Sequence, residues 1–413
     1  MYLMKLDLLR MIFFLSASLI LCTMYIYTGM RLIRPLAISI KTKKILWSIL
    51  IFLLVFCFTP FIFWIFRPEA PWMDALIRIV FLQFGLFSIL FPLVLFRDGI
   101  LILIRTVQNI FSKYAKINSS SNSDKNSDDY TETLMNRKSF LANAGTASLV
   151  GFTTTLTGYG LFNALQPPEV KKVTVHSKNL PVEFEGFKIV QISDLHVGPS
   201  IKFDYVEECV KIAGSLNADI AVLTGDMVDG SVKYLSKDMD PIADLKTSSG
   251  IYLCTGNHEY YSGVDAWMDA FRGMGVKPLI NEGIVLNKGK SALSVSGVTD
   301  IREGHKLKGH ATNPLAALRN IPDHAYKVLL AHQPKSIFGA SSMGYDLQLS
   351  GHTHGGQYFP YNYLVEFFHP YVSGLHKHGN TQIYVNTATG YWGPPQRMGR
   401  PGEITLIELR RKS

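Results

Sequence analysis

The sequence is poor in cysteine and in charge. Only four of its 413 residues are Cys, and their spacing suggests no disulfide framework. Charged residues make up 18% of the chain and hydrophobic residues 47%, a composition that excludes an intrinsically disordered protein. The length exceeds that of a single small domain.

The positive charge lies almost entirely in the N-terminal part. The formal net charge is +9, and residues 1–165 contain 16 basic and 8 acidic side chains, whereas the remainder contains 25 and 24. All 12 His lie beyond residue 165. The C-terminal part is therefore nearly neutral and offers no basic stripe, so we expect no nucleic-acid partner.

Long apolar runs occupy the N-terminal part. Residues 8–30, 45–66 and 75–96 could each cross a hydrocarbon core of roughly 30 Å as a helix. Residues 139–165 are a weaker candidate, because they contain glycines and a threonine cluster. We predict three transmembrane helices within residues 1–110, a polar cytoplasmic linker at 111–138 in which residues 118–129 are disordered, a fourth transmembrane helix at 139–165, and a globular domain at 166–413.

The loops between these runs predict the orientation. The first loop contains five basic residues, whereas the second, residues 67–74, contains one Arg and two acidic residues. Because cytoplasmic loops retain Lys and Arg, the first loop is predicted inside and the second outside. Four crossings place the globular domain on the extracytoplasmic side, and we expect an integral protein of a bacterial inner (plasma) membrane with membrane lipids as partners.

Short buried strands alternate with helical patterns in the C-terminal part and predict an α/β domain. Five predicted strands cover residues 188–193, 219–224, 251–255, 327–331 and 347–350. Each is followed by Asp, Asn or His: Asp194 and His196, then Asp226 and Asp229, then Asn257 and His258, then His332, then His352 and His354. Open α/β sheets place their ligand sites at such strand ends.

Imidazole and carboxylate groups together suit zinc, iron or manganese, and a carboxylate can bridge two cations. No Cys lies at these positions, which argues against a structural zinc or an iron–sulfur cluster. The sequence therefore predicts two divalent metal ions, whose identity among Mn, Zn and Fe stays open.

These five segments resemble the calcineurin-like metallophosphoesterase superfamily, over roughly residues 173–409. The resemblance implies a two-sheet β-sandwich flanked by helices, following an N-terminal helical transmembrane region. It also implies a first metal held by Asp194, His196, Asp226 and His354, and a second that shares Asp226 and is held by Asn257, His332 and His352. His258 would face the substrate, and Asp229 would orient a neighbouring ligand.

Two further segments bear on the substrate. Seven of the fourteen residues at 358–371 are aromatic, and these either pack against the core or contact a membrane surface or the acyl chains of a lipid. Arg397 lies in a Gly/Pro-rich loop and is a candidate ligand of the substrate phosphate.

The leading hypothesis is a membrane-anchored, metal-dependent phosphohydrolase or phosphodiesterase. It would cleave a phosphate ester, possibly lipid-linked, by attack of a metal-bound hydroxide. Two alternatives stay open. One is a UDP-2,3-diacylglucosamine pyrophosphatase of lipid A synthesis, whose cytoplasmic substrate requires residues 139–165 not to cross the membrane. The other is a non-catalytic membrane sensor, although a sensor would not need the complete set of metal ligands.

Overall fold

The computed structural model describes residues 2–59, 69–118 and 128–412. It divides into two compact units, one made of Met1–Arg67 with Leu82–Gly158 and the other of Pro68–Phe81 with Tyr159–Ser413. Each unit is described by itself below. The globular unit thus begins a few residues earlier than residue 166 and also includes a short segment from the N-terminal part.

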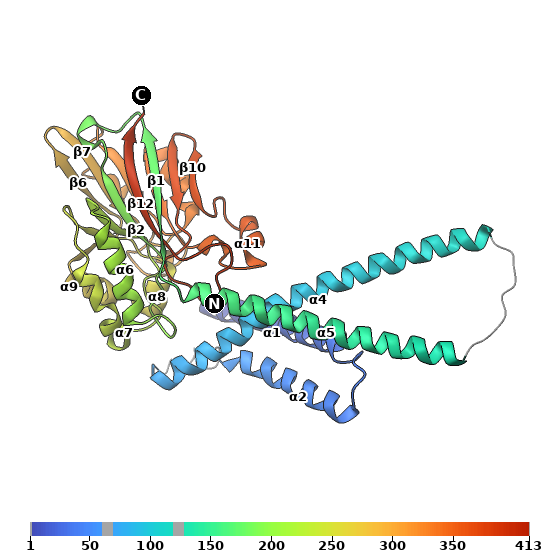
Figure 1. The fold of residues 1–413 in the computed structure, drawn as a ribbon. Coiled ribbons are helices and arrows are strands. Elements are labelled where there is room, and N and C mark those ends of the chain that lie inside the picture. The colour runs from blue at the N-terminus through green and yellow to red at the C-terminus, as the bar shows by residue number, and fades with distance from the viewer. Residues whose placement is uncertain (1, 60–68, 119–127, 413) are drawn as a thin grey trace. The chain divides into compact units, whose positions relative to one another are not determined.

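The first unit is helical (Figure 1). Its helices are α1 (Tyr2–Leu32), α2 (Ile40–Cys57), most of α4 (Pro71–Asn118) and most of α5 (Asp128–Ala164). Tyr25, Cys57 and Phe87 form a buried cluster that joins α1, α2 and α4. Most other apolar side chains of these helices are exposed, as in helices that face lipid.

Among the described residues, two helical stretches are long and apolar enough to cross a membrane, Phe14–Leu32 and Pro71–Ser112. They coincide with the first and third predicted spans. The second predicted span lies partly outside the described residues, and the fourth lies within α5, which does not reach the same hydropathy. Membrane crossing by these segments stays a prediction.

The stretch predicted to be disordered, residues 118–129, lies mostly outside the described residues, which leave out 119–127. At its two ends helix α4 continues to Asn118 and α5 begins at Asp128, so the described flanks of the linker at 111–138 are helical. The polar residues of these flanks favour solvent without opposing a helix, since only Pro and Gly do so strongly. The cytoplasmic position of the linker stays a prediction.

The second unit is a sandwich of two six-stranded sheets (Figure 1), which confirms the predicted fold class. The first sheet has the order β1 (Glu169–Ser177), β12 (Glu403–Arg411), β2 (Lys188–Ile192), β3 (Ile220–Leu223), β4 (Ile251–Leu253) and β5 (Val276–Pro278). The second has the order β10 (Gly374–His378), β11 (Thr381–Val385), β9 (Leu347–Ser350), β8 (Tyr326–Leu330), β7 (Ser291–Gly297) and β6 (Glu282–Lys288).

The central strands β2, β3 and β4 run parallel, as do β7, β8 and β9. Parallel strands covered on both faces read as continuous apolar runs, because alternate side chains enter two different cores. In β3, Ile220 and Val222 enter the core between the sheets, whereas Ala221 and Leu223 enter the core beneath the helices.

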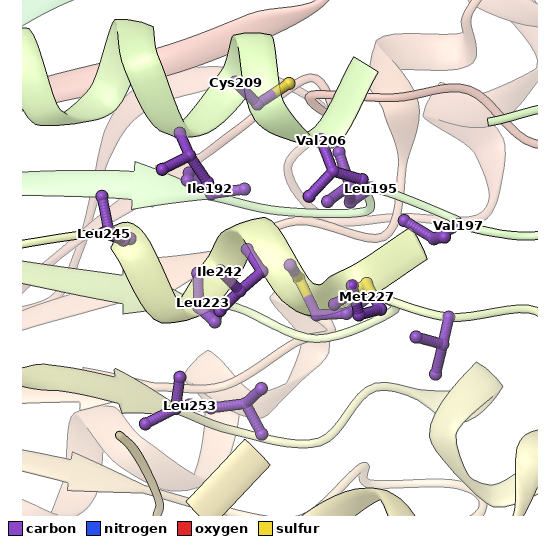
Figure 2. Close-up of a cluster of buried hydrophobic side chains, with 14 of the residues drawn as sticks. Ile192, Leu195, Val197, Val206, Cys209, Leu223, Met227, Ile242, Leu245 and Leu253 are labelled. Atoms are coloured by element: carbon purple, nitrogen blue, oxygen red, sulfur yellow. The ribbon is translucent and has the colours of Figure 1, made fainter. Parts of the chain in front are cut away.

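The outer face of the first sheet is covered by α6 (Phe203–Ser215), α7 (Val232–Met239) and α9 (Val264–Gly273). Figure 2 shows this core, where Val206 and Cys209 of α6 pack over Ile192 of β2 and Leu195. Leu195, Val197 and Met227 belong to the same cluster although they lie in loops beyond the strands. The apolar core therefore anchors the loops that follow β2 and β3.

Candidate metal centre

The loops that follow five strands bring the predicted side chains together. Three groups of side chains have their potential ligand atoms within 4.8 Å of one another: Asp194, His196 and His354; His196, Asp226 and His258; and Asp226, His332 and His352. The strands belong to two sheets rather than one, so the site lies where the ends of both sheets meet. Six of the seven predicted ligands are in these groups, and Asn257 is the seventh.

Asp226 is common to two of the groups. Its Oδ2 lies 3.0 Å from His332 Nε2 and 3.9 Å from His196 Nε2. On one side, His354 Nε2 lies 3.4 Å from Asp194 Oδ1, and on the other, His352 Nδ1 lies 3.1 Å from His332 Nε2. This arrangement matches two cation positions that share one carboxylate.

The second nitrogen of each imidazole shows why these rings need a cation. His332 Nδ1 donates to the carbonyl of Thr224 at 2.8 Å, and His354 Nδ1 donates to Gln357 Oε1 at 3.0 Å. His196 Nδ1 donates to Asp229 at 3.2 Å. These acceptors fix one proton on Nδ1, so Nε2 is the nitrogen of each ring that faces the site and that a cation could bind.

Two such nitrogens face each other, because His196 Nε2 and His354 Nε2 are 3.2 Å apart. Burial lowers the pKa of His354, which favours the neutral ring that can bind a cation. Two nitrogens bound at roughly 2.0–2.1 Å to one ion would lie about 3.0–3.4 Å apart, as these do. The geometry therefore fits a divalent cation between the rings.

Asn257 supplies an independent test of the fit. Its Oδ1 is buried and has no hydrogen-bond partner among the described residues. An unsatisfied buried oxygen costs free energy, which a hard or borderline cation would recover. Asn257 begins α8 (Asn257–Ser262), and the neighbouring amide of His258 donates to Asp226 Oδ1 at 2.8 Å. The donor set is thus nitrogen and oxygen throughout, as Mn, Zn and Fe accept.

Backbone strain is concentrated at the same residues. Asp194, His196, Asp226, His352 and His354 all have positive φ, between 51° and 71°. Non-glycine residues avoid this region, and strained backbones persist where the surrounding structure enforces them, commonly at functional sites. This backbone conformation occurs at two predicted ligands in each of the loops after β2 and β9, and at one in the loop after β3.

Two glycines permit the close approach of the loops. A Cβ on Gly256 would lie 2.1 Å from Asp226 Oδ1, and one on Gly351 would lie 2.1 Å from Asp194 Oδ2. Neither contact is possible for a real side chain. These glycines therefore belong to the site as much as the ligands they flank.

Electrostatics within the cluster hold the carboxylates ionised. Burial would raise the pKa of Asp226, but His332 and His258 lower it well below its usual range. Burial likewise opposes the ionisation of Asp194, and His332 and His354 lower its pKa. Burial and the neighbouring His332 lower the pKa of His352 to about 3, so this ring is neutral and able to ligate.

Asp229 holds two rings at once. Its carboxylate accepts from His196 Nδ1 and from His258 Nδ1, and the contact with His258 is one of the shortest in the site. Burial raises the pKa of Asp229, but His258 and His196 together lower it below its usual value. The expectation that Asp229 orients its neighbours is consistent with these contacts.

Asp229→Asn should lower metal affinity or turnover about 10- to 100-fold. The Asn side chain has one acceptor oxygen in place of two, so it cannot hold both imidazole rings as the carboxylate does. Titration with Mn²⁺ and steady-state turnover of a phosphodiester would measure both effects. Asp244→Asn is the matched control, since Asp244 is an exposed carboxylate of the same unit. Equal behaviour of the two variants would contradict this positioning role.

Sequence reasoning missed Glu259. Its buried carboxylate accepts from the backbone amides of Asp226, Met227 and Gly256 at 3.0, 2.7 and 2.6 Å. Burial and Asp226 raise its pKa to about 6. Glu259 thereby links the loop after β3 to the loop after β4. In the sequence, only its position directly after Asn257 and His258 indicated that it belongs to the site.

Two aromatic rings near the site were also missed. The Trp392 ring centroid lies 5.5 Å from that of His258, and Tyr261 lies 5.2 Å from His258. His369 also lies near the site, with its ring 5.3 Å from that of His352. Trp392 and His369 follow no predicted strand, and Tyr261 lies further along α8 than Asn257 and His258, so the strand-end pattern could not identify these three residues.

The prediction that Arg397 binds the substrate phosphate is wrong. Arg397 is 1% exposed, and its Nη1 and Nη2 donate to backbone carbonyls of Thr387, Ala388, Gly390, Arg400 and Pro401, all in the connection between β11 and β12. Burial lowers its pKa to about 10. Because both terminal nitrogens of the guanidinium are occupied by carbonyls and the side chain is buried, it is not placed to bind a substrate.

Comparison with known proteins agrees with this site. The model of the calcineurin-like phosphoesterase family matches residues 187–356. The chain is 34% identical over 267 residues to the transmembrane protein with metallophosphoesterase domain of Danio rerio, and 36% identical over 277 residues to that of Bos taurus. An uncharacterized metallophosphoesterase of Helicobacter pylori (strain J99) is 34% identical over 269 residues, which cover 64% of this chain and 70% of that protein.

The two-sheet fold and the shared-carboxylate site define a dimetal metallophosphoesterase domain. The chain belongs to the calcineurin-like metallophosphoesterase family. The match covers 62% of this chain and 61% of the Danio rerio relative, and 64% of this chain and 62% of the Bos taurus relative, so it spans less than two thirds of either relative.

Proposed function

We propose that this protein is a membrane-anchored hydrolase that uses two divalent ions to cleave phosphate esters linked to a lipid. The observation that supports hydrolysis is the pair of ligand clusters that share Asp226. Two ions, when bound, would supply an activated water and neutralise the charge that develops on the phosphoryl oxygens. Mn, Zn and Fe all suit the donors present.

His258 is placed to act on the substrate rather than on a cation. Its Nδ1 is held by Asp229, and its Nε2 lies 3.9 Å from Asp226 Oδ2. Burial lowers its pKa, but Asp229 and Asp226 raise it to about 10, so Nε2 keeps a proton at neutral pH. This proton can stabilise a phosphoryl oxygen or pass to the departing alcohol.

An exposed apolar patch supports the lipid link. Tyr363, Leu364, Phe367 and Phe368, which we call the apolar patch, are 64%, 46%, 82% and 68% exposed. They lie in and after α11 (Tyr361–Leu364), which closely follows the His352 and His354 loop. Tyr358, in contrast, is buried, so only part of the aromatic segment packs against the core. Large exposed apolar groups beside a site are typical of contact with lipid or another partner.

The variant Tyr363→Ser/Phe367→Ser tests the lipid link. Transfer of one such side chain into an apolar environment contributes about 1.5–3 kcal/mol, so kcat/KM for a phospholipid in mixed micelles should fall at least about tenfold. Hydrolysis of soluble bis(p-nitrophenyl) phosphate should not change. Leu315→Ser/Val182→Ser, which removes two exposed apolar side chains elsewhere, is the control. A loss on both substrates, or on neither, would contradict the lipid link.

Contacts within the second unit support an extracytoplasmic domain. Glu69 accepts from the Ser231 amide at 2.6 Å, and Asp74 Oδ2 accepts from Tyr234 OH and from Lys202 Nζ, each at 2.9 Å. Glu69 and Asp74 belong to the second loop, which the charge pattern places outside. Because this loop and the phosphoesterase domain form one compact unit, they should lie on the same side of the membrane.

A reporter fusion tests this topology. A periplasmically active phosphatase fused after Gln166 should be active, whereas the same fusion after Lys44, in the first loop, should be inactive. A cytoplasmic reporter should show the opposite pattern. Cytoplasmic activity after Gln166 would reject the topology and favour a substrate on the cytoplasmic side, such as a nucleotide-linked lipid.

A further inference from the structure

A cavity of about 280 Å³ opens beside the second cation position. Asn257 and His352 line it on the side of the metal ligands, and Arg302, Lys335, His369 and Phe368 line it elsewhere. Phe368 is also a member of the apolar patch. One cavity therefore combines metal ligands, two cationic side chains and an apolar rim.

The positive charges of Arg302 and Lys335 are only partly balanced by the described carboxylates. No described carboxylate lies within ion-pair distance of Lys335. Arg302 has a carboxylate at 3.8 Å, on Glu303, and Lys306 Nζ also holds that carboxylate, at 2.5 Å. Both cationic side chains are exposed, so they can attract an anion that approaches the cavity from solution.

His369 contributes an unsatisfied polar atom to the same cavity. Its Nδ1 is buried and has no hydrogen-bond partner among the described residues. A buried polar atom of this kind requires a partner. A bound oxyanion would be one, either by accepting from a protonated Nδ1 or by donating its own proton to Nδ1.

We propose that Arg302 and Lys335 bind a second anionic group of the substrate, next to the phosphoryl group that the metal ions hold. This inference rests on the proposed function, because it assigns the substrate to a class: an amphiphile with two oxyanions, such as a lipid diphosphate or a phosphodiester with an acidic headgroup. Phe368 joins this subsite to the apolar patch, so the lipid chain and the second anion leave the metal centre on the same side.

Binding of small phosphonates to the full-length Mn²⁺-loaded protein in detergent tests the subsite without turnover. Methylenediphosphonate carries two anionic groups and methylphosphonate carries one, and calorimetry at a fixed free Mn²⁺ concentration compares them. Wild type should bind the diphosphonate at least about tenfold more tightly, since charge-assisted contacts to an oxyanion are strong. Arg302→Gln/Lys335→Gln should lose that advantage and keep its affinity for methylphosphonate.

The matched control is Lys277→Gln/Lys290→Gln, which removes two exposed positive charges outside the cavity. It should behave as wild type. The subsite is refuted if wild type does not prefer the diphosphonate, or if the Arg302 and Lys335 variant retains the preference. Weaker binding of both phosphonates to that variant would also refute it, because the effect would then be general.

Turnover separates this inference from the proposed function. With farnesyl diphosphate and lysophosphatidylserine as substrates, Arg302→Gln/Lys335→Gln should raise KM for whichever is cleaved and leave KM for farnesyl monophosphate unchanged. The substrate affected identifies a phosphoryl or a carboxylate group as the second anion. If wild type cleaves none of the three but prefers the diphosphonate, the lipid-hydrolase proposal fails and the anion subsite stands.

Discussion

Asp226→Asn is expected to abolish hydrolysis of every phosphate ester. The carboxylate is common to two of the clusters, 3.0 Å from His332 Nε2 on one side and 3.9 Å from His196 Nε2 on the other. An amide presents only one oxygen and carries no charge. The variant should therefore bind both cations more weakly, because it lacks the carboxylate that they would share. Loss of a principal electrostatic group costs at least about 10³-fold in turnover.

Metal content and fold should be measured on the same sample. Elemental analysis should find less metal in Asp226→Asn than in wild type, and far-ultraviolet circular dichroism should be unchanged. The loop should keep its conformation in this variant, because the backbone amide of Asp226 donates to Glu259 and this bond does not involve the Asp226 side chain. Asp244→Asn should match wild type in all three measurements. Substantial turnover with full metal content would overturn the shared-carboxylate site.

The side chains of the candidate metal centre could be expected from the sequence to lie together, because each follows a strand that is itself recognisable. The runs that form β2, β3, β4, β8 and β9 are short, apolar and buried, and a predicted ligand stands within a few residues of each end. The local pattern is therefore enough to predict the cluster. The apolar spacing of helices α6 and α9 likewise matches the face that each of them buries.

What could not be predicted depends on contacts distant in sequence. Glu259 is identified only when its carboxylate meets the amides of Asp226 and Met227. His369 gains its place from a ring contact with His352, and Lys335 from the cavity that it shares with Arg302. The burial of Tyr358 and the exposure of Phe367 likewise separate two aromatic residues that the sequence presents as one cluster.

Arg397 is the clearest such case, because its Gly/Pro-rich loop is compatible with both a phosphate ligand and a structural tether. The structure distinguishes them by its partners, which are carbonyls at 387, 388 and 390 and at 400 and 401. The connection between β11 and β12 that contains these carbonyls is joined to the metal centre, since Gly390 N donates to the carbonyl of Asp194 at 3.1 Å. Arg397 thus supports a ligand loop from behind.

Arg397→Met is therefore expected to destabilise the phosphoesterase unit strongly. Among the described residues, Arg397 is the only side chain that donates to this set of carbonyls, and its loss should cost about 3–5 kcal/mol. For a domain of this size about 2–4 °C are lost per kcal/mol, so the midpoint of thermal unfolding should fall by roughly 10 °C. Near-ultraviolet circular dichroism of the full-length protein in detergent would follow the transition.

The controls separate support from substrate binding. Arg319→Met removes an exposed guanidinium and should leave the midpoint unchanged. Arg397→Lys keeps the charge but offers three donors in place of five, so its midpoint should lie between those of wild type and Arg397→Met. At a temperature where Arg397→Met is folded, its KM for bis(p-nitrophenyl) phosphate should equal that of wild type. A raised KM with an unchanged midpoint would instead return Arg397 to the substrate.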